Sequence, residues 1–233
     1  DVSGLMAENR KNQVRAAAFY DVDGTLVDSN VIYVYLYYAL RMQKISDRLG
    51  RLLRAAFFSP AYAVAEVASR TLFNKMFYNN YRGMEHERLV LMGREVAEEA
   101  LLTHLYGDAR KRVDKAREMG LVQVIVSGSL DMIMEPFAEI LGIDRVLANK
   151  LEFENGRATG RLIPPVLASK NKKTVIEAFA REENIDLTRS YAFGDSRYDL
   201  PMLECVGFPC AVNPDKELEQ IARERGWPVV PFA

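Results

Sequence analysis

Acidic residues follow two short apolar runs of this sequence. Asp21 and Asp23 come directly after the run Val14–Tyr20, and Asp195 and Asp199 follow a second, shorter run. At the carboxyl ends of strands in an open α/β sheet, such side chains point toward a bound ligand. Carboxylates gathered in a cleft repel one another unless a cation neutralises them, and an all-oxygen set suits Mg²⁺. The pattern therefore predicts a magnesium site at this edge of a sheet.

Two further motifs, a pair of serines after an apolar run and a lysine cluster, contain groups that could bind a phosphate. Ser127-Gly128-Ser129 ends the β-branched run Leu121–Val126, and Lys170, Lys172 and Lys173 begin a segment with a helical pattern. Mg²⁺ commonly completes its coordination with phosphate oxygens, and a phosphoryl group in transfer needs donors and positive charge around it. Each motif alone is common in turns and helix caps. Together they indicate phosphoryl transfer, in which one aspartate attacks phosphorus and another moves a proton.

The apolar pattern predicts the elements that would hold these residues. Charged helices alternate with short strands from residue 108 onward, which is typical of an α/β fold. We expect a Rossmann-like, doubly wound parallel sheet, formed by residues 14–29 and 107–233. The turn Asn155-Gly156 predicts a hairpin that lies beside the sheet as a flap.

Residues 30–106 differ in character, because their apolar and aromatic residues recur at helical intervals. We expect an inserted all-helical cap, with Ser59-Pro60 as a break between helices. Its many aromatic residues are expected to pack mainly within the cap; an apolar substrate pocket or a patch facing a membrane or a partner is the alternative. The polar segment 1–13 is expected to be flexible. The helices expected in the cap are Val31–Met42, Ile45–Phe58, Pro60–Tyr78 and Met84–Leu105.

The order and spacing of four motifs resemble those of the haloacid dehalogenase (HAD) superfamily. The helical insert after the first motif resembles the phosphoserine-phosphatase-like branch, which includes stand-alone bacterial hydrolases and domains fused to lipid acyltransferases. The resemblance spans almost the whole chain, and it implies a phosphatase that forms an aspartyl-phosphate. The motifs are Asp21-Val22-Asp23-Gly24-Thr25, Ser127-Gly128, Lys172 and Gly194-Asp195-Ser196-Arg197-Tyr198-Asp199.

The resemblance also implies a role for each motif. Asp21 is the expected nucleophile and Asp23 the expected general acid and base. Ser127 and the backbone N–H of Gly128 are expected to hold phosphate oxygens, and Lys172 to neutralise the phosphoryl group, with Lys170 as the alternative lysine. The expected Mg²⁺ ligands are Asp21, the backbone carbonyl of Asp23 and the side chain of Asp195, with Asp199 ligating or supporting them.

Substrate recognition is expected to involve the cap. Phosphoserine phosphatases carry a glutamate that binds the substrate's amino group where this chain has Asn30, which weakens a phosphoserine assignment. Tyr198 occupies a motif position that is usually small or Asn, so the pocket floor is expected to be narrower or more aromatic. Arg82 is a candidate for an anionic group of the substrate, with a solvated arginine as the alternative.

The sequence thus predicts a Mg²⁺-dependent phosphohydrolase that acts on a small phosphorylated substrate. Phosphotransfer to an acceptor other than water, or a non-catalytic domain that binds a phospholipid or a partner, are the alternatives. A net charge of −1 over 233 residues gives no general drive toward nucleic acid or an anionic membrane, so any basic site is expected to be local. No apolar run reaches the ~20 residues of a membrane span. Cys205 and Cys210 lack a paired motif, so a cytoplasmic location is expected, with peripheral membrane contact left open. The sequence gives no indication of the oligomeric state.

Overall fold

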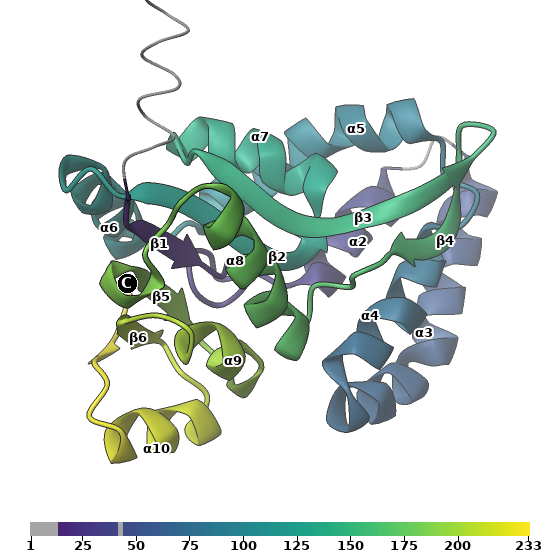
Figure 1. Ribbon diagram of the computed structural model, residues 1–233. Helices are drawn as coiled ribbons and strands as arrows, with labels where there is room; N and C mark the ends of the chain where they lie inside the picture. Colours follow the sequence, from purple (N-terminus) through teal and green to yellow (C-terminus); the bar gives the residue numbers. More distant parts are fainter. Residues whose placement is uncertain (1–13, 42–43) are drawn as a thin grey trace, which may run out of the picture.

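A twisted sheet forms the centre of the protein (Figure 1). The computed structural model describes residues 14–41 and 44–233, so the predicted flexible segment 1–13 lies outside the described residues. The strand order is β4-β3-β2-β1-β5-β6-β7, and all neighbouring pairs are parallel except β3 with β4. The predicted α/β class with a Rossmann-like sheet is confirmed. The strands are β1 (Ala17–Tyr20), β2 (Val122–Leu130), β3 (Arg145–Glu154), β4 (Arg157–Ile163), β5 (Tyr191–Gly194), β6 (Phe208–Val212) and β7 (Val229–Val230).

Both faces of the sheet are covered by helices. Successive residues of a strand point to opposite faces, and β1 shows this clearly: Ala18 and Tyr20 enter one apolar core, and Ala17 and Phe19 enter the other. Helices α6 and α7 contribute to the first core, and α8, α9 and α10 to the second. The fold is therefore doubly wound. These helices are α6 (Gly107–Glu118), α7 (Asp131–Leu141), α8 (Lys170–Glu182), α9 (Leu200–Leu203) and α10 (Lys216–Glu224).

Residues 30–106, which we call the cap, are inserted between β1 and α6. The chain leaves and rejoins the core at one place, where Asp28 N donates to His104 O (2.9 Å) and Tyr106 N donates to Leu26 O (3.0 Å). None of the described helices combines the length and apolar character needed to cross a bilayer. The cap helices are α2 (Val31–Leu40), α3 (Ile45–Ala68), α4 (Arg70–Tyr78) and α5 (His86–Glu95), followed by a π-helical turn at Val96–Leu101.

Pro60 does not end a cap helix, contrary to prediction. Helix α3 continues through it to Ala68, because its later turns bury Tyr62 and Ala65 and this packing outweighs one missing N–H donor. The break lies instead at Ser69, whose extended backbone starts α4 and whose hydroxyl accepts from Leu72 N (3.4 Å). The first predicted helix end, Met42, lies outside the described residues.

The predicted hairpin of β3 and β4 is part of the main sheet and not a separate flap. Its turn residues have positive φ, 50° at Asn155 and 73° at Gly156, as an Asn-Gly hairpin requires. Strand β3 pairs with β2, which leaves β4 at the edge of the sheet. The cap covers this edge, since Gly83 N donates to Ala158 O (2.8 Å) and Ala158 N donates back to Met84 O (2.8 Å).

Candidate active site

A pocket of about 250 Å³ lies where β1, β2 and β5 end, beside the start of α8 and the cap. It brings together residues from all four sequence motifs, which are separated by up to 178 positions in the chain. Tertiary structure therefore brings together most of the residues that the sequence predicts for the site. Those that line this pocket are Asp21, Asp23, Asn30, Gly128, Lys172, Asp195, Tyr198 and Asp199.

The loops of the first and the fourth motifs lie in close contact, because Gly24 has no side chain to keep Asp195 away. Gly24 has φ +83°, and a Cβ atom there would lie 2.4 Å from Asp195 Oδ2. Thr25 Oγ1 donates to Asp195 Oδ1 (3.3 Å), and the backbone N–H of Asp21 donates to Phe193 O (3.0 Å). Only glycine gives the first loop both this conformation and this approach to Asp195.

Lys172 joins two of the acids. Its Nζ lies 2.6 Å from Asp21 Oδ1 and 2.6 Å from Asp199 Oδ1, and its side chain is 6% exposed. Lys170, the alternative lysine, is exposed at the first residue of α8. A helix places residues two apart on different sides, so only one of the two reaches the sheet end. The geometry favours Lys172.

Asp199 is held on both carboxylate oxygens. Its Oδ1 accepts from Lys172, and its Oδ2 accepts from Ser196 N (3.2 Å), Ser196 Oγ (3.1 Å) and Asp195 N (3.3 Å). Burial opposes ionisation, but Lys172 and these donors outweigh it and lower the pKa of Asp199. Gly194 leaves room for this turn, because a Cβ there would lie 2.6 Å from Asp199 Cβ. Asp199 is thus suited to holding Lys172 and the turn that carries Asp195.

Three acids could hold a cation. One carboxylate oxygen each from Asp21, Asp195 and Asp199 lies within 4.8 Å of the others, and Lys172 is the one lysine that contacts them among the described residues. Burial, followed by mutual repulsion with Asp199, raises the pKa of Asp21 and of Asp195. When ionised, the three carboxylates carry more negative charge than Lys172 offsets, and their donor atoms are all oxygen, so the residues fit Mg²⁺.

Only one of the two carboxylate oxygens of Asp23 has a hydrogen-bond partner. Ser129 Oγ donates to its Oδ2 (3.2 Å), whereas its Oδ1 is buried without a hydrogen-bond partner. Burial raises the pKa of Asp23, which favours a protonated carboxyl able to donate a proton. Ser129 was not among the residues predicted for the site. The β2 ladder is irregular between Ser127 and Leu130, so regular strand alternation would not have indicated its contact with Asp23.

The second motif lies at the end of β2 and not in a loop beyond it. Ser127 is fully buried, and its Oγ accepts from Ser129 N (3.0 Å). The carbonyl of Gly128 accepts from Tyr78 OH (2.8 Å) and Asn149 Nδ2 (2.7 Å), which fixes the peptide between the cap and β3. Gly128 lines the pocket directly.

Arg70, and not Arg82, is the cap arginine that lines the pocket. Its guanidinium pairs with the Glu66 carboxylate and lies 5.6 Å from the Tyr198 ring centroid. Tyr198 OH in turn donates to Glu66 O (2.8 Å), so the fourth motif touches the cap. The backbone carbonyl of Arg82 instead accepts from Arg51, on the side of the cap that faces the β3–β4 hairpin. Arg82 is therefore not the cap arginine placed to meet an anionic group of the substrate, and Arg70 takes its place as the candidate.

Two amide side chains lie at the cap side of the pocket. Asn74 is 1% exposed, and its Oδ1 has no partner. Asn30 is exposed at the rim, where its Oδ1 accepts from Ile32 N (3.0 Å) and Tyr33 N (3.1 Å) and thereby caps α2. The side-chain oxygen of Asn30 is thus already occupied by hydrogen bonds to the first turn of α2.

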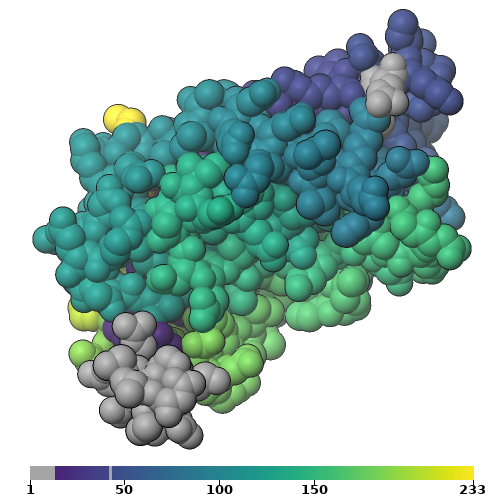
Figure 2. Space-filling model, turned by 90° about the horizontal axis from the view of Figure 1, so that it is seen from above, coloured from purple at the N-terminus to yellow at the C-terminus, as the bar shows by residue number. Residues whose placement is uncertain are grey.

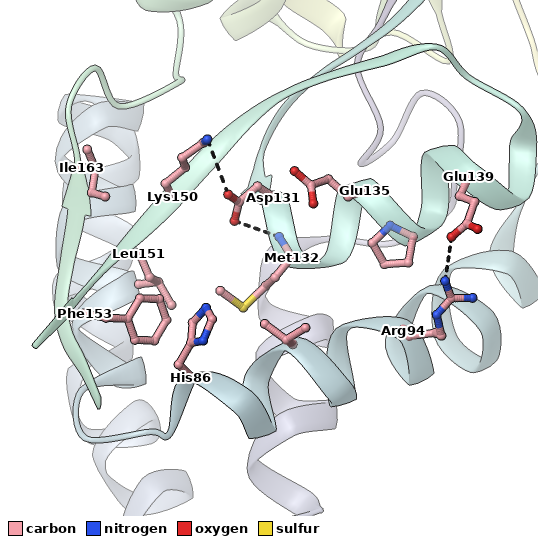
Figure 3. A pocket seen from close by; sticks show the side chains of 12 residues that line it. His86, Arg94, Asp131, Met132, Glu135, Glu139, Lys150, Leu151, Phe153 and Ile163 are labelled. Atoms are coloured by element: carbon pink, nitrogen blue, oxygen red, sulfur yellow. Dashed lines mark hydrogen bonds and ion pairs between the residues drawn. The ribbon is translucent and has the colours of Figure 1, made fainter. Parts of the chain in front are cut away.

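A second, larger pocket of about 480 Å³ lies between α5, α7 and the hairpin (Figure 3). Two ion pairs join its own residues: Lys150 Nζ lies 4.0 Å from Asp131 Oδ2, and Arg94 Nη2 lies 2.6 Å from Glu139 Oε2. None of the predicted catalytic residues lines it. The smaller pocket is therefore the candidate active site.

The chain is similar to known proteins in sequence and in fold. Residues 18–204 match a family described as haloacid dehalogenase-like hydrolase. The chain is 32% identical over 226 residues to the "Inhibition of morphological differentiation protein" of Streptomyces azureus, covering 94% of this chain and 79% of that protein. It is 30% identical over 221 residues to a phosphoserine phosphatase of Mycobacterium tuberculosis H37Rv, covering 93% and 71%. A solved structure of a Bordetella pertussis Tohama I protein with unknown function has a TM-score of 0.82 at 23% identity, covering 94% and 99%.

Proposed function

We propose that this phosphatase, which belongs to the haloacid dehalogenase-like hydrolase family, depends on Mg²⁺ and hydrolyses a small phosphomonoester. The reaction would proceed through an aspartyl-phosphate on Asp21. The observation that carries the proposal is the pair of carboxyl groups at the end of β1. Asp21 is held by a buried lysine, and Asp23 keeps a buried oxygen without a partner. These two environments support a nucleophilic role for Asp21 and a proton-transfer role for Asp23.

In the first step, an Asp21 oxygen forms a bond to phosphorus as the ester P–O bond breaks. Asp23 gives its proton to the leaving oxygen, which departs as an alcohol. Lys172 and the backbone N–H of Gly128 hold the phosphoryl oxygens, with Ser127 supporting that strand end. In the second step, water attacks phosphorus and gives a proton to Asp23, and the bond to Asp21 breaks to release phosphate.

Mg²⁺ would be held by Asp21, Asp195 and the backbone carbonyl of Asp23, with Asp199 supporting Asp195. When bound, Mg²⁺ neutralises charge on the phosphoryl oxygens. Asp199 acts through its hydrogen bonds to Lys172 and to the backbone N–H of Asp195.

The substrate is proposed to be small, because the pocket holds only about 250 Å³. Arg70 and the free Asn74 Oδ1 offer a cation and an acceptor beyond the phosphate position. One relative is a phosphoserine phosphatase. In this chain, however, Asn30 contributes no charge and its carbonyl caps α2, so we expect phosphoserine to be outperformed by another phosphomonoester.

The test is turnover of p-nitrophenyl phosphate by Asp21→Asn. This near-isosteric change removes the nucleophile, so we expect a loss of about 10³-fold or more, and a similar loss in EDTA. Asp28→Asn is the matched control, because Asp28 is an exposed aspartate of the same loop. Undiminished activity of Asp21→Asn or in EDTA would refute the proposal. Free phosphate released in stoichiometric amount without an added acceptor separates hydrolysis from phosphotransfer, and a panel that includes phosphoserine and lysophosphatidate ranks the substrates.

A further inference from the structure

Helix α3 carries a line of exposed apolar side chains along its outer side. They follow at intervals of three, four or seven residues, which places them on one face of the helix. Each is between 56% and 79% exposed. We call this set the α3 stripe; it consists of Ile45, Leu49, Leu53, Phe57, Val64 and Val67.

The exposure is a property of a well-packed helix. The opposite side of α3 buries Tyr62 and Ala65 and contacts α4, so the helix itself is held by the cap. Its 24 residues span about 36 Å. The helix lies at the outer edge of the cap, away from α10, and the cap forms one end of the molecule (Figures 1 and 2). A continuous exposed apolar surface of this kind marks an interaction site.

The residues beside the stripe are mainly basic. Segment 41–54 contains five lysine and arginine residues and one acid, and no acid occurs between Asp47 and Glu66, although the whole chain has a net charge of −1. Lys44 and Arg54 are exposed. A long helix with an apolar face and basic flanks is the pattern of helices that lie in the interface of an anionic membrane.

We propose that the α3 stripe docks on the surface of an anionic lipid bilayer and holds the enzyme there as a peripheral protein. The apolar side chains would enter the headgroup boundary, and the flanking cations would meet lipid phosphates. Parallel pairing with a second copy of the chain would be opposed, because it would bring the two basic segments together. Glu66 and Arg70, at the end of α3 and the start of α4, line the catalytic pocket, so docking would keep that pocket near the bilayer. The inference is independent of the proposed chemistry.

Vesicle sedimentation of the full chain tests this inference. We expect the protein to sediment with vesicles of equal phosphatidylglycerol and phosphatidylcholine, and about tenfold less with phosphatidylcholine alone or at high salt. Leu53→Ser with Phe57→Ser removes two stripe side chains and should lower binding by about tenfold or more. Lys44→Glu with Arg54→Glu should abolish the preference for anionic lipid.

A matched control uses exposed apolar residues elsewhere. Val90→Ser with Leu91→Ser changes two side chains of α5 that are 45% and 67% exposed, and should leave vesicle binding unchanged. Circular dichroism of each variant verifies folding. The proposal is overturned if the unaltered chain does not bind anionic vesicles, or if the two serine pairs behave alike. A dimer in solution that Leu53→Ser with Phe57→Ser dissociates, without vesicle binding, would assign the stripe to a second copy instead.

Discussion

Replacing Lys172 by methionine removes the ammonium group that lies between Asp21 and Asp199. Methionine retains most of the volume of the buried side chain, so the change mainly leaves two carboxylates without their partner at 2.6 Å. Breaking a buried ion pair by removing one partner costs about 3–5 kcal/mol. For a chain of this size, such a loss lowers the melting temperature by roughly 10 °C.

The assay is thermal unfolding followed by circular dichroism in EDTA, so that no divalent cation replaces the lysine. Lys170→Met is the matched control, because Lys170 is exposed two residues earlier in the same helix, and it should melt within about 1 °C of the unaltered chain. The reasoning fails if Lys172→Met is as stable as the unaltered chain, or if both variants lose the same stability.

Two further predictions concern Ser129 and Asp131. Ser129→Ala should lower kcat by up to about tenfold with little change in KM, because it removes the hydrogen bond that orients Asp23; an unchanged kcat would contradict this. Burial raises the pKa of Asp131, so the folded chain binds this proton more tightly than the unfolded chain, and stability falls as the pH rises from the unfolded to the folded pKa. Asp131→Asn keeps the acceptor for Met132 N and should therefore raise the melting temperature at pH 7 but not at pH 3, whereas an equal effect at both values would exclude the burial argument.

The sheet and most of the site follow from local sequence patterns. Strand β1 and the acids at its end are adjacent in the chain, so the apolar run and the Asp-Gly turn predict both. Such features need no knowledge of distant contacts. The preference for Lys172 over Lys170 comes instead from the resemblance to the family, and the structure supports it because only Lys172 is seen to contact the acids among the described lysines.

The features that the sequence did not predict depend on tertiary packing. Pro60 predicts a helix end by its own chemistry, but burial of the later turns of α3 outweighs it. Arg82 and Arg70 are both arginines of the cap, and only the path of α4 along the pocket decides which one lines it. The contact of Ser129 with Asp23 joins residues 106 positions apart.

The covering of β4 by the cap has a consequence for how the two parts depend on each other. An uncovered edge strand offers unpaired N–H and C=O groups to any other chain. The loop at Gly83 and Met84 occupies those groups at Ala158 with two hydrogen bonds of 2.8 Å. A core from which residues 30–106 were deleted would therefore lose more than its substrate cover, because β4 would become a template for aggregation. Any cap exchanged into this core would have to bring its own extended segment to shield that edge.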